Sequence, residues 1–159
     1  MALEIELKFL VKNNAWKEQA KGVHYRQGYL NTDKSRTVRV RTINNKAFLT
    51  IKGISIGATR KEFEYEIPFL EGKTILNELC KKPIIEKFRY KIKAGNDLIW
   101  EIDEFLGENE GLIVAEIELQ YETQRFVKPD WLGEEVTTNP KFYNSSLVSF
   151  PFSKWSLKI

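Results

Sequence analysis

The chain of 159 residues has the size of one ordinary domain, and its 42% hydrophobic and 30% charged residues are typical of a globular protein and exclude a disordered one. Its net charge of only +3 gives little support to nucleic-acid binding. No apolar run reaches the ~20 residues that a membrane helix needs, and the charged N-terminus is unlike a signal peptide. The single cysteine, Cys80, cannot form an internal disulfide. We therefore expect one cytoplasmic domain over residues 1–159 with no membrane partner.

Alternation of apolar and polar residues predicts β-strands along most of the chain. The N-terminal run Leu3-Glu4-Ile5-Glu6-Leu7-Lys8-Phe9 alternates without a break. Together with a less regular case at 25–30, the expected strands cover residues 3–9, 25–30, 37–41, 48–52, 62–67, 87–93, 98–103 and 115–119. Asn44-Asn45 and residues 94–97 are typical of tight turns between neighbouring strands. Strands so close in sequence indicate an antiparallel meander.

Helical features are few and short. Asn14 is a candidate N-cap for a helix over residues 15–21, which Gly22 would end. A second helix is expected over residues 71–81, before Pro83. The remaining expected helices cover residues 120–126, 131–136 and 141–148.

The charges on the expected strands are sorted by sign. Residues i and i+2 share one face of a strand, so each pair of like charges lies on one face roughly 6–7 Å apart. The basic pairs are Arg39 with Arg41 and Lys87 with Arg89. The acidic pairs are Glu4 with Glu6, Glu62 with Glu64, Glu101 with Asp103, and Glu116 with Glu118. Such pairs disfavour ionisation unless something compensates them.

Two interpretations of this pattern remain open from the residues alone. In the first, the charged face is the solvated side of an ordinary antiparallel sheet. In the second, about eight strands close into a barrel with the ionic face inside. The carboxylates then supply ligands for Mg²⁺ or Mn²⁺, and the Arg and Lys side chains bind phosphate oxygens. Trp16, the 75–79 helical stripe and the aromatic C-terminus would cover the apolar outer face.

The segment Glu4-Ile5-Glu6-Leu7-Lys8 resembles the ExExK signature of the CYTH, or triphosphate tunnel metalloenzyme, family. Further segments look like blocks of the same family in the same order, and the short bacterial members are the most similar in kind. These segments are residues 27–30, 39–41, 50–53, 60–66, 86–90, 100–105, 111–119, 133–137 and 143–145.

The resemblance implies a mainly β (α+β) fold, a closed eight-stranded antiparallel barrel with short helices packed outside. It implies hydrolysis of inorganic triphosphate to pyrophosphate and phosphate with Mg²⁺ or Mn²⁺. A class IV adenylate cyclase or a nucleoside or thiamine triphosphatase of the same family is the alternative, and a non-catalytic phosphate- or nucleic-acid-binding barrel is the third. The expected partner is a small-molecule triphosphate, and the protein is expected to be a monomer or a homodimer.

The resemblance also assigns roles to residues. The phosphate-binding residues are Lys8, Arg39, Arg41, Lys52, Lys87 and Arg89. The metal ligands are Glu4, Glu6, Glu116 and Glu118, and Glu62 and Glu64 either assist them or neutralise the basic residues. The expected catalytic residues are Glu4, Glu6, Lys8, Tyr29 and Lys87, although Tyr29 is equally consistent with packing. We expect structural roles for His24 and Cys80.

Overall fold

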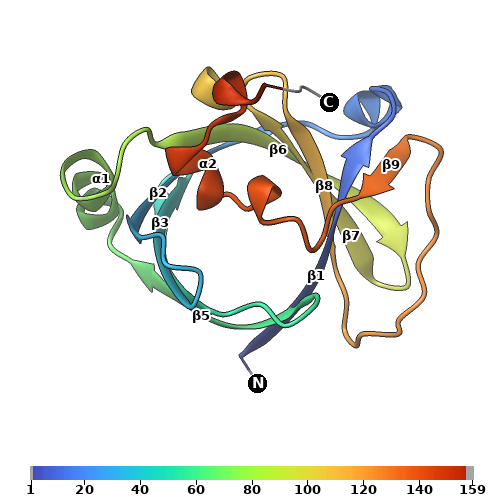
Figure 1. Ribbon diagram of the computed structural model, residues 1–159, viewed down its shortest axis with the longest axis horizontal. Helices are drawn as coiled ribbons and strands as arrows, with labels where there is room; N and C mark the ends of the chain where they lie inside the picture. Colours follow the sequence, from blue (N-terminus) through green and yellow to red (C-terminus); the bar gives the residue numbers. More distant parts are fainter. Residues whose placement is uncertain (1, 157–159) are drawn as a thin grey trace.

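A computed structural model describes residues 2–156, and within them antiparallel strands form a closed barrel of eight strands with a ninth attached to it (Figure 1). The order around the sheet is β5-β4-β3-β2-β6-β7-β8-β1-β9, and an additional β5–β1 pairing closes the ring. The strands are β1 (Leu3–Val11), β2 (Val23–Asn31), β3 (Arg36–Ile43), β4 (Lys46–Gly53), β5 (Thr59–Ile67), β6 (Ile85–Gly95), β7 (Leu98–Phe105), β8 (Ile113–Glu118) and β9 (Leu132–Glu135). The predicted barrel is thereby confirmed.

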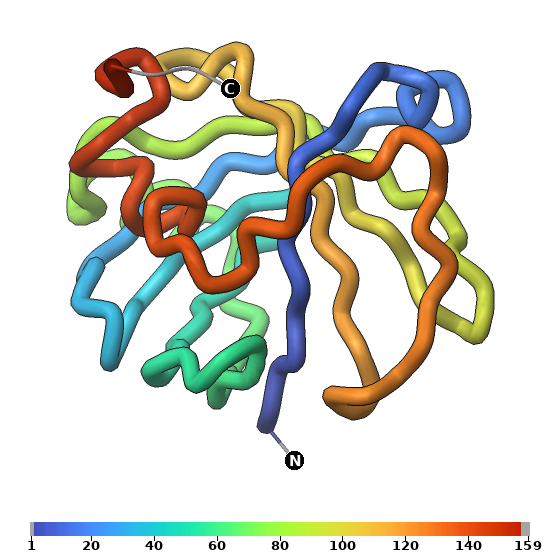
Figure 2. Tube along the Cα trace, turned by 45° about the vertical axis from the view of Figure 1, so that its right-hand side comes forward, coloured from blue at the N-terminus to red at the C-terminus, as the bar shows by residue number. Residues whose placement is uncertain are grey.

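The strand β1 closes the barrel because it has partners on both edges (Figure 2). One edge pairs with β8, placing Lys8 opposite Glu116. The other edge is shared: Leu3–Ile5 pair with β5, and Phe9 and Val11 pair with β9. The β3–β4 hairpin turns at Asn44-Asn45, as predicted, with Asn44 at a φ of 54°.

The helices lie on the outside of the barrel and at one of its ends. The helix α1 (Phe69–Glu78) packs outside on β3 and β4. The C-terminal segment contains η3 (Pro140–Phe142), α2 (Ser146–Ser149) and η4 (Phe152–Lys154), and Figure 1 shows it crossing the ring of strands. The remaining 3₁₀ helices of the described chain are η1 (Ala15–Gln19) and η2 (Gly107–Asn109). None of the helices between residues 2 and 156 is long and apolar enough to span a bilayer.

Several helix predictions were wrong. Residues 120–126 form turns and bends, and residues 131–136 contain the strand β9, because Leu132 pairs with Val11 and Glu135 with Phe9. The segment 141–148 is helical only in η3 and α2. At the N-terminus η1 is a 3₁₀ helix, and the side chain of Asn13, not that of Asn14, accepts a hydrogen bond from its first turn. The structure thus has less helix than the sequence indicated.

The apolar faces of the strands point outward and are buried under these additions. Trp16 of η1 is fully buried and makes an edge contact with Tyr90, with ring centroids 5.0 Å apart. Leu76 of α1 is also fully buried, and Trp155 of the C-terminal segment packs on Phe152. This outside-in arrangement leaves the charged faces of the strands to line the interior.

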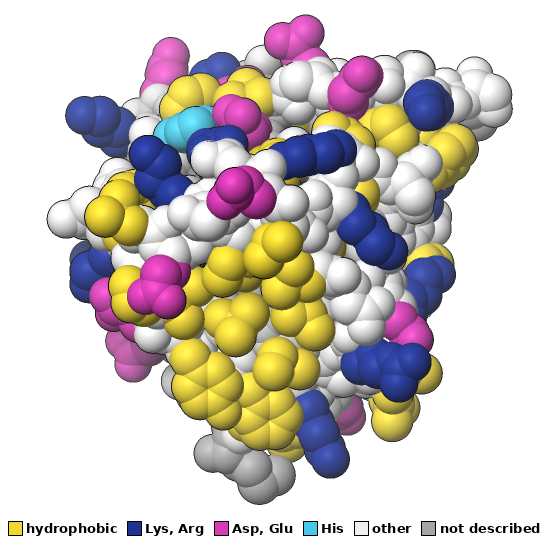
Figure 3. Space-filling model, turned by 90° about the vertical axis from the view of Figure 1, so that its left-hand side faces the viewer, with side chains coloured by type: hydrophobic (Ala, Val, Ile, Leu, Met, Phe, Trp, Pro, Cys, Tyr) yellow, Lys and Arg dark blue, Asp and Glu magenta, His cyan; other side chains and the backbone are white. Residues whose placement is uncertain are grey.

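One part of the outer face remains uncovered. Because α1 packs on β3 and β4, the outward side chains of β5 and the adjoining end of β4 stay exposed. Phe63 lies opposite Ile51 and Tyr65 opposite Leu49, and Phe63, Ile51 and Tyr65 are all exposed. Figure 3 shows apolar side chains gathered on the side of the molecule that carries this face.

Candidate active site

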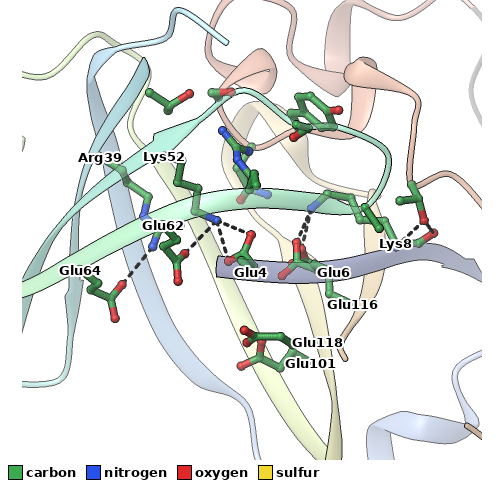
Figure 4. A pocket seen from close by; sticks show the side chains of 18 of the residues that line it. Glu4, Glu6, Lys8, Arg39, Lys52, Glu62, Glu64, Glu101, Glu116 and Glu118 are labelled. Carbon is green, nitrogen blue, oxygen red and sulfur yellow. Dashed lines mark hydrogen bonds and ion pairs between the residues drawn. The ribbon is translucent and has the colours of Figure 1, made fainter. Parts of the chain in front are cut away.

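All thirteen side chains that the sequence assigned to the site line one cavity inside the barrel, of about 220 Å³ (Figure 4). They come from β1, β2, β3, β4, β5, β6 and β8, which carry them at alternate positions. Among the residues that line this cavity, seven are Lys or Arg and seven are Glu. The structure therefore brings the predicted residues together around one ionic cavity, in which Glu64 and Glu118 remain exposed to solvent.

Most of the lysines and arginines lie on one arc of the barrel wall and the glutamates on the other, while Lys8 on β1 and Arg60 on β5 are cations among the glutamates. Strands β4, β3 and β6 carry Lys52, Arg39, Arg41, Lys87 and Arg89, with β2 between β3 and β6. We call this the basic arc. The acidic arc consists of β7, β8, β1 and β5, which follow one another around the ring and carry Glu101, Glu116, Glu118, Glu4, Glu6, Glu62 and Glu64. Sorting by strand, visible in the sequence, thus becomes sorting by side of the cavity.

Buried partners hold the basic arc in place. Asp103 is fully buried and accepts hydrogen bonds from Lys87 Nζ at 2.7 Å and from Arg89 Nε at 2.7 Å. The ring of Tyr25 lies 5.2 Å from the Arg41 guanidinium and 4.9 Å from that of Arg89. Cation–π contacts of this kind stabilise buried guanidinium groups. Asp103 thus serves to fix cations, although the sequence paired it with Glu101 as an acid.

The guanidinium groups of the basic arc are crowded, and Arg39 and Arg41 share a single carboxylate, that of Glu64. Burial lowers the pKa of Arg41 to about 10, and repulsion by Arg39 and Arg89 adds to the effect. Burial lowers the pKa of Lys87 to about 7 against the attraction of Asp103, and Arg89 lowers it further. The Nε atoms of Arg39 and Arg41 are buried and have no hydrogen-bond partner in the described protein. A multiply charged anion would supply the missing acceptors and offset this repulsion.

Lys8, on β1 within the acidic arc, and Lys52, on β4 beside it, are held by carboxylates of that arc. Lys8 Nζ lies 3.2 Å from Glu6 Oε1 and 2.5 Å from Glu116 Oε2. Burial would lower the pKa of Lys8, but Glu116 and Glu6 outweigh it and raise the pKa. Lys52 Nζ similarly lies 3.1 Å from Glu4 Oε1 and 3.2 Å from Glu62 Oε2. Each lysine therefore neutralises a pair of carboxylates (Figure 4).

Glu118 differs from the other carboxylates of the acidic arc. It is the one without a salt bridge among residues 2–156, and it lies opposite Glu6 in the β1–β8 pairing. Partial burial raises its pKa to about 7, and repulsion by Glu4, Glu6, Glu62 and Glu101 adds to this rise. Figure 4 shows Glu118 beside Glu101. Arg89 and Lys91 pair with Glu101, whereas no cation of the described chain pairs with Glu118 itself.

The acidic arc fits a divalent cation by its chemistry. Carboxylate oxygens are the ligands that Mg²⁺ and Mn²⁺ prefer, and a cation beside Glu118 would relieve the repulsion that raises its pKa. No three acidic, His or Cys side chains of the described residues converge closely enough to form a ready-made metal site. The ion pairs with Lys8 and Lys52 account for this, because they orient the carboxylates toward the ammonium groups. Mg²⁺ commonly keeps several waters and needs only one or two carboxylates.

Sequence reasoning missed several lining residues. Arg60 was left between rim and surface, and it lines the cavity, as does Glu101. The neutral residues were not singled out, because period-two charge patterns do not include them. They are Thr37, Ser55, Thr137, Tyr143, Asn144 and Ser145. Four of them, Thr137, Tyr143, Asn144 and Ser145, lie near the C-terminus. The family resemblance of residues 133–137 and 143–145 was the sequence feature that could have identified them.

The two remaining candidates lie outside the cavity. His24 is exposed, and its Nε2 lies 3.0 Å from Glu86 Oε2 on the outer surface. Cys80 is buried beside Val40 and Leu76, and burial raises the pKa of its thiol. Neither residue is among those that line the cavity.

The fold and the cavity define a class of protein: a β-tunnel whose interior places a basic wall opposite an acidic one. A sequence model of the CYTH domain matches residues 2–148. The chain belongs to the CYTH family.

Similar proteins cover nearly the whole chain. An inorganic triphosphatase of Acetivibrio thermocellus is 55% identical over 155 residues, which cover 98% of this chain and 99% of that protein. An inorganic triphosphatase of Nitrosomonas europaea is 35% identical over 148 residues, covering 91% of this chain and 96% of that protein. A crystal structure of the inorganic triphosphatase NE1496 gives a TM-score of 0.66 at 32% identity, covering 93% of this chain and 95% of that one.

Proposed function

We propose that this protein hydrolyses inorganic triphosphate to pyrophosphate and phosphate inside the barrel, with a divalent cation. The observation that carries the proposal is the basic arc facing the acidic arc across one cavity. The first can bind a polyphosphate and the second a cation. Two similar proteins that are called inorganic triphosphatases match almost the full chain, which supports the same reaction.

The basic arc would bind the substrate. Arg39, Arg41 and Arg89 offer guanidinium groups suited to two-oxygen contacts with phosphate, and Lys52 and Lys87 act as point charges. Phosphoryl transfer is accelerated chiefly by positioning and electrostatic stabilisation, because charge spreads over the transferred group. Tyr29 and Lys87 line the same side of the cavity and would donate hydrogen bonds to the reacting phosphate.

The acidic arc would hold the cation and orient the attacking water. We assign Glu4, Glu6, Glu116 and Glu118 to Mg²⁺ or Mn²⁺, with Glu62 and Glu64 as auxiliary residues. When bound, the ion supplies positive charge beside the phosphate oxygens and activates water. Glu6 and Glu116, which hold Lys8 in the free protein, would serve as ligands of the ion, and the Lys8 ammonium group would then be available to phosphate. Water attacks phosphorus, the anhydride P–O bond breaks, and a carboxylate of the acidic arc takes the water proton.

The cavity lining favours inorganic triphosphate over a nucleotide. Among the residues that line it, Tyr29 and Tyr143 are the aromatic ones, and the wall is otherwise ionic or small. A nucleobase or a thiamine ring needs a largely apolar pocket. Adenylate cyclase and nucleoside or thiamine triphosphatase activities are therefore secondary candidates. A purely anion-binding barrel has no use for the seven glutamates.

Phosphate release from tripolyphosphate, ATP and thiamine triphosphate, measured with Mg²⁺, Mn²⁺ or EDTA, tests the proposal. We expect metal-dependent turnover that strongly favours tripolyphosphate. Cyclic AMP formed from ATP would instead indicate a cyclase. Binding of tripolyphosphate without turnover under every condition would contradict the enzymatic proposal.

We also propose that residues 1–159 act as one unit in the cytoplasm. The cavity draws residues from β1 at one end of the chain and from Asn144 near the other. The lone thiol, Cys80, is buried and free, which suits a reducing compartment. Sedimentation would distinguish a monomer from a homodimer.

A further inference from the structure

A chain of polar contacts joins the C-terminal segment to two residues of the cavity. Asn144 Oδ1 accepts hydrogen bonds from Lys87 Nζ and from Gln27 Nε2, each at 3.0 Å. Gln27 Nε2 also donates to the Tyr29 hydroxyl at 3.0 Å. Gln27 is fully buried, and Asn144 arrives from the segment that crosses the end of the barrel. The chain therefore runs from Lys87 through Asn144 and Gln27 to Tyr29.

The direction of every hydrogen bond in this chain follows from Lys87. Lys87 Nζ donates to Asp103 and to Asn144, and in its protonated form, which Asp103 favours, it only donates, so Asn144 presents its oxygen to Lys87. That oxygen then requires a donor from Gln27, which fixes the Gln27 amide with Nε2 toward Asn144. The reverse orientation would place two acceptor oxygens against each other. The cost of the observed orientation is visible, because Gln27 Oε1 is buried and has no hydrogen-bond partner in the described residues.

The orientation of the Gln27 amide determines which hydrogen bonds the Tyr29 hydroxyl can make. A phenol oxygen carries one hydrogen and can accept a hydrogen bond as well. Because Gln27 donates to this oxygen, the Tyr29 hydrogen is left for another acceptor, and Tyr29 lines the cavity. The network thus turns Tyr29 into a donor toward whatever the cavity binds.

We propose that Asn144 and Gln27 are positioning residues: Asn144 holds the Lys87 ammonium and orients Gln27, and Gln27 directs the Tyr29 proton into the cavity. This inference rests on the proposed triphosphate hydrolysis for its kinetic consequence. Neither residue needs to touch the substrate to have this effect. The C-terminal segment is accordingly part of the site and does not serve only to cover the barrel.

A double-mutant cycle between Gln27 and Tyr29 tests the second half of the inference. Gln27→Met keeps the size of the side chain and removes its hydrogen bonds. We expect it to lower kcat for tripolyphosphate about tenfold, within the range of coupling between residues of one network. We expect KM to change by less than about twofold, since the interaction acts on the reacting phosphate. In a Tyr29→Phe background, Gln27→Met should have no further effect on kcat. If kcat of the double variant were instead lowered by the product of the two single-variant decreases, Gln27 would act independently of Tyr29 and its role would be only structural.

Substitutions at Asn144 test the first half. Asn144→Leu removes the acceptor for both Lys87 and Gln27, whereas Asn144→Asp keeps an acceptor oxygen for each. We expect Asn144→Asp to retain a higher kcat than Asn144→Leu, while its added negative charge raises KM. Equal kcat values for the two variants would overturn the proposal. Asn109→Leu is the matched control, because Asn109 is another buried amide that binds the C-terminal segment, at Phe152 N, but outside the cavity. It should lower Tm without lowering kcat.

A measurement on the metal-free protein separates this inference from the proposed reaction. Side-chain amide protons of Gln27, followed by ¹H–¹⁵N NMR, should exchange slowly in the wild type and faster in Asn144→Leu. If they do and tripolyphosphate is not hydrolysed, the network stands and the proposed reaction fails. If Gln27 exchanges rapidly in the wild type, or is unaffected by Asn144→Leu, the network is wrong whatever the activity.

Discussion

Glu6 and Glu118 lie directly opposite each other on β1 and β8. Like charges at opposed positions of a sheet destabilise it, and Glu118 has no salt bridge in the described chain to offset the repulsion. A bound cation would explain why the protein has this pair, because both carboxylates could coordinate the ion and their mutual repulsion would be offset.

Glu118→Gln should separate stability from function. Removing one of two opposed carboxylates relieves repulsion, so we expect a Tm in EDTA at least equal to that of the wild type. The increase in Tm on adding Mn²⁺ should become smaller, and kcat/KM should fall about 10²-fold, as expected for loss of one electrostatic contact in the transition state. Thermal melting with and without metal measures the first effects. Glu110→Gln, an exposed site away from the cavity, should match the wild type. A Glu118→Gln protein with full metal response would contradict the ligand assignment.

Metal affinity should depend on pH around neutrality. Partial burial and four neighbouring carboxylates raise the pKa of Glu118 to about 7 in the metal-free protein. Below that pH the carboxyl is protonated and must lose its proton to bind a cation, whereas above it the ligand is ready. The dissociation constant for Mn²⁺ should therefore rise by up to about tenfold for each pH unit below 7. Calorimetry in two buffers of different ionisation enthalpy would detect the released proton. In Glu118→Gln the dependence should flatten, and an unchanged slope would assign it to another group.

Arg41→Ala should weaken substrate binding with little cost to the fold. Arg41 is crowded by Arg39 and Arg89, which together with burial lower its pKa, and removing one of the three reduces their repulsion. We expect KM for tripolyphosphate to rise at least about tenfold, because charge-assisted contacts to phosphate are lost. Steady-state kinetics measures the rise, and Tm should stay within a few degrees of the wild-type value. Arg36→Ala is the control, since the Arg36 side chain is exposed and lies outside the cavity. An unchanged KM would remove Arg41 from the phosphate-binding residues.

Asp103→Asn should destabilise the fold. The substitution leaves Lys87 and Arg89 without their buried counter-ion, and breaking a buried pair typically costs about 3 kcal/mol or more. Burial would raise the pKa of Asp103, but Arg89 and Lys87 outweigh it and lower the pKa. The contribution of Asp103 is therefore present above its ordinary pKa, near pH 4, and is lost as the pH falls through the lowered value. Urea unfolding at pH 7 and near pH 3 should show the variant's deficit shrinking in acid. A constant deficit would mean that Asp103 acts through packing and not through charge.

The sequence was sufficient to predict most of the barrel, because its strands alternate charge with bulky apolar residues. The strand β2 was harder to recognise, since Tyr25, Gln27 and Tyr29, which share one face of it, are uncharged. Gly28 lies on its outer face, where an added Cβ would lie 2.8 Å from Cys80 Cβ, so close packing explains the missing side chain. The family resemblance supplied the same segment on other grounds.

The region after β8 shows where sequence patterns are insufficient. Leu132–Glu135 is only four residues long and becomes a strand because β1 offers it an edge at Phe9 and Val11. The sequence of this segment does not distinguish a strand from a short helix, so its conformation is determined by the pairing with β1. Asn144 is a similar case: its importance follows from a contact with Lys87, 57 residues away in the sequence. Period-two patterns identify residues that share a strand face, but they do not indicate a loop that reaches into the same space.

The position of β1 has a consequence for how the protein is made. Lys8 and Glu116 face each other although 108 residues separate them in the sequence. During synthesis β1 leaves the ribosome before its partner β8, which follows only after six other strands. Until residue 118 has been added, one edge of β1 has no partner, and its apolar side chains have no complete outer layer to pack against. Pairings over such long separations fold slowly, on the millisecond-to-second scale, and expose the chain to aggregation meanwhile. The charged residues that alternate with Leu, Ile and Phe in this strand therefore also oppose aggregation of the nascent segment before β8 pairs with it.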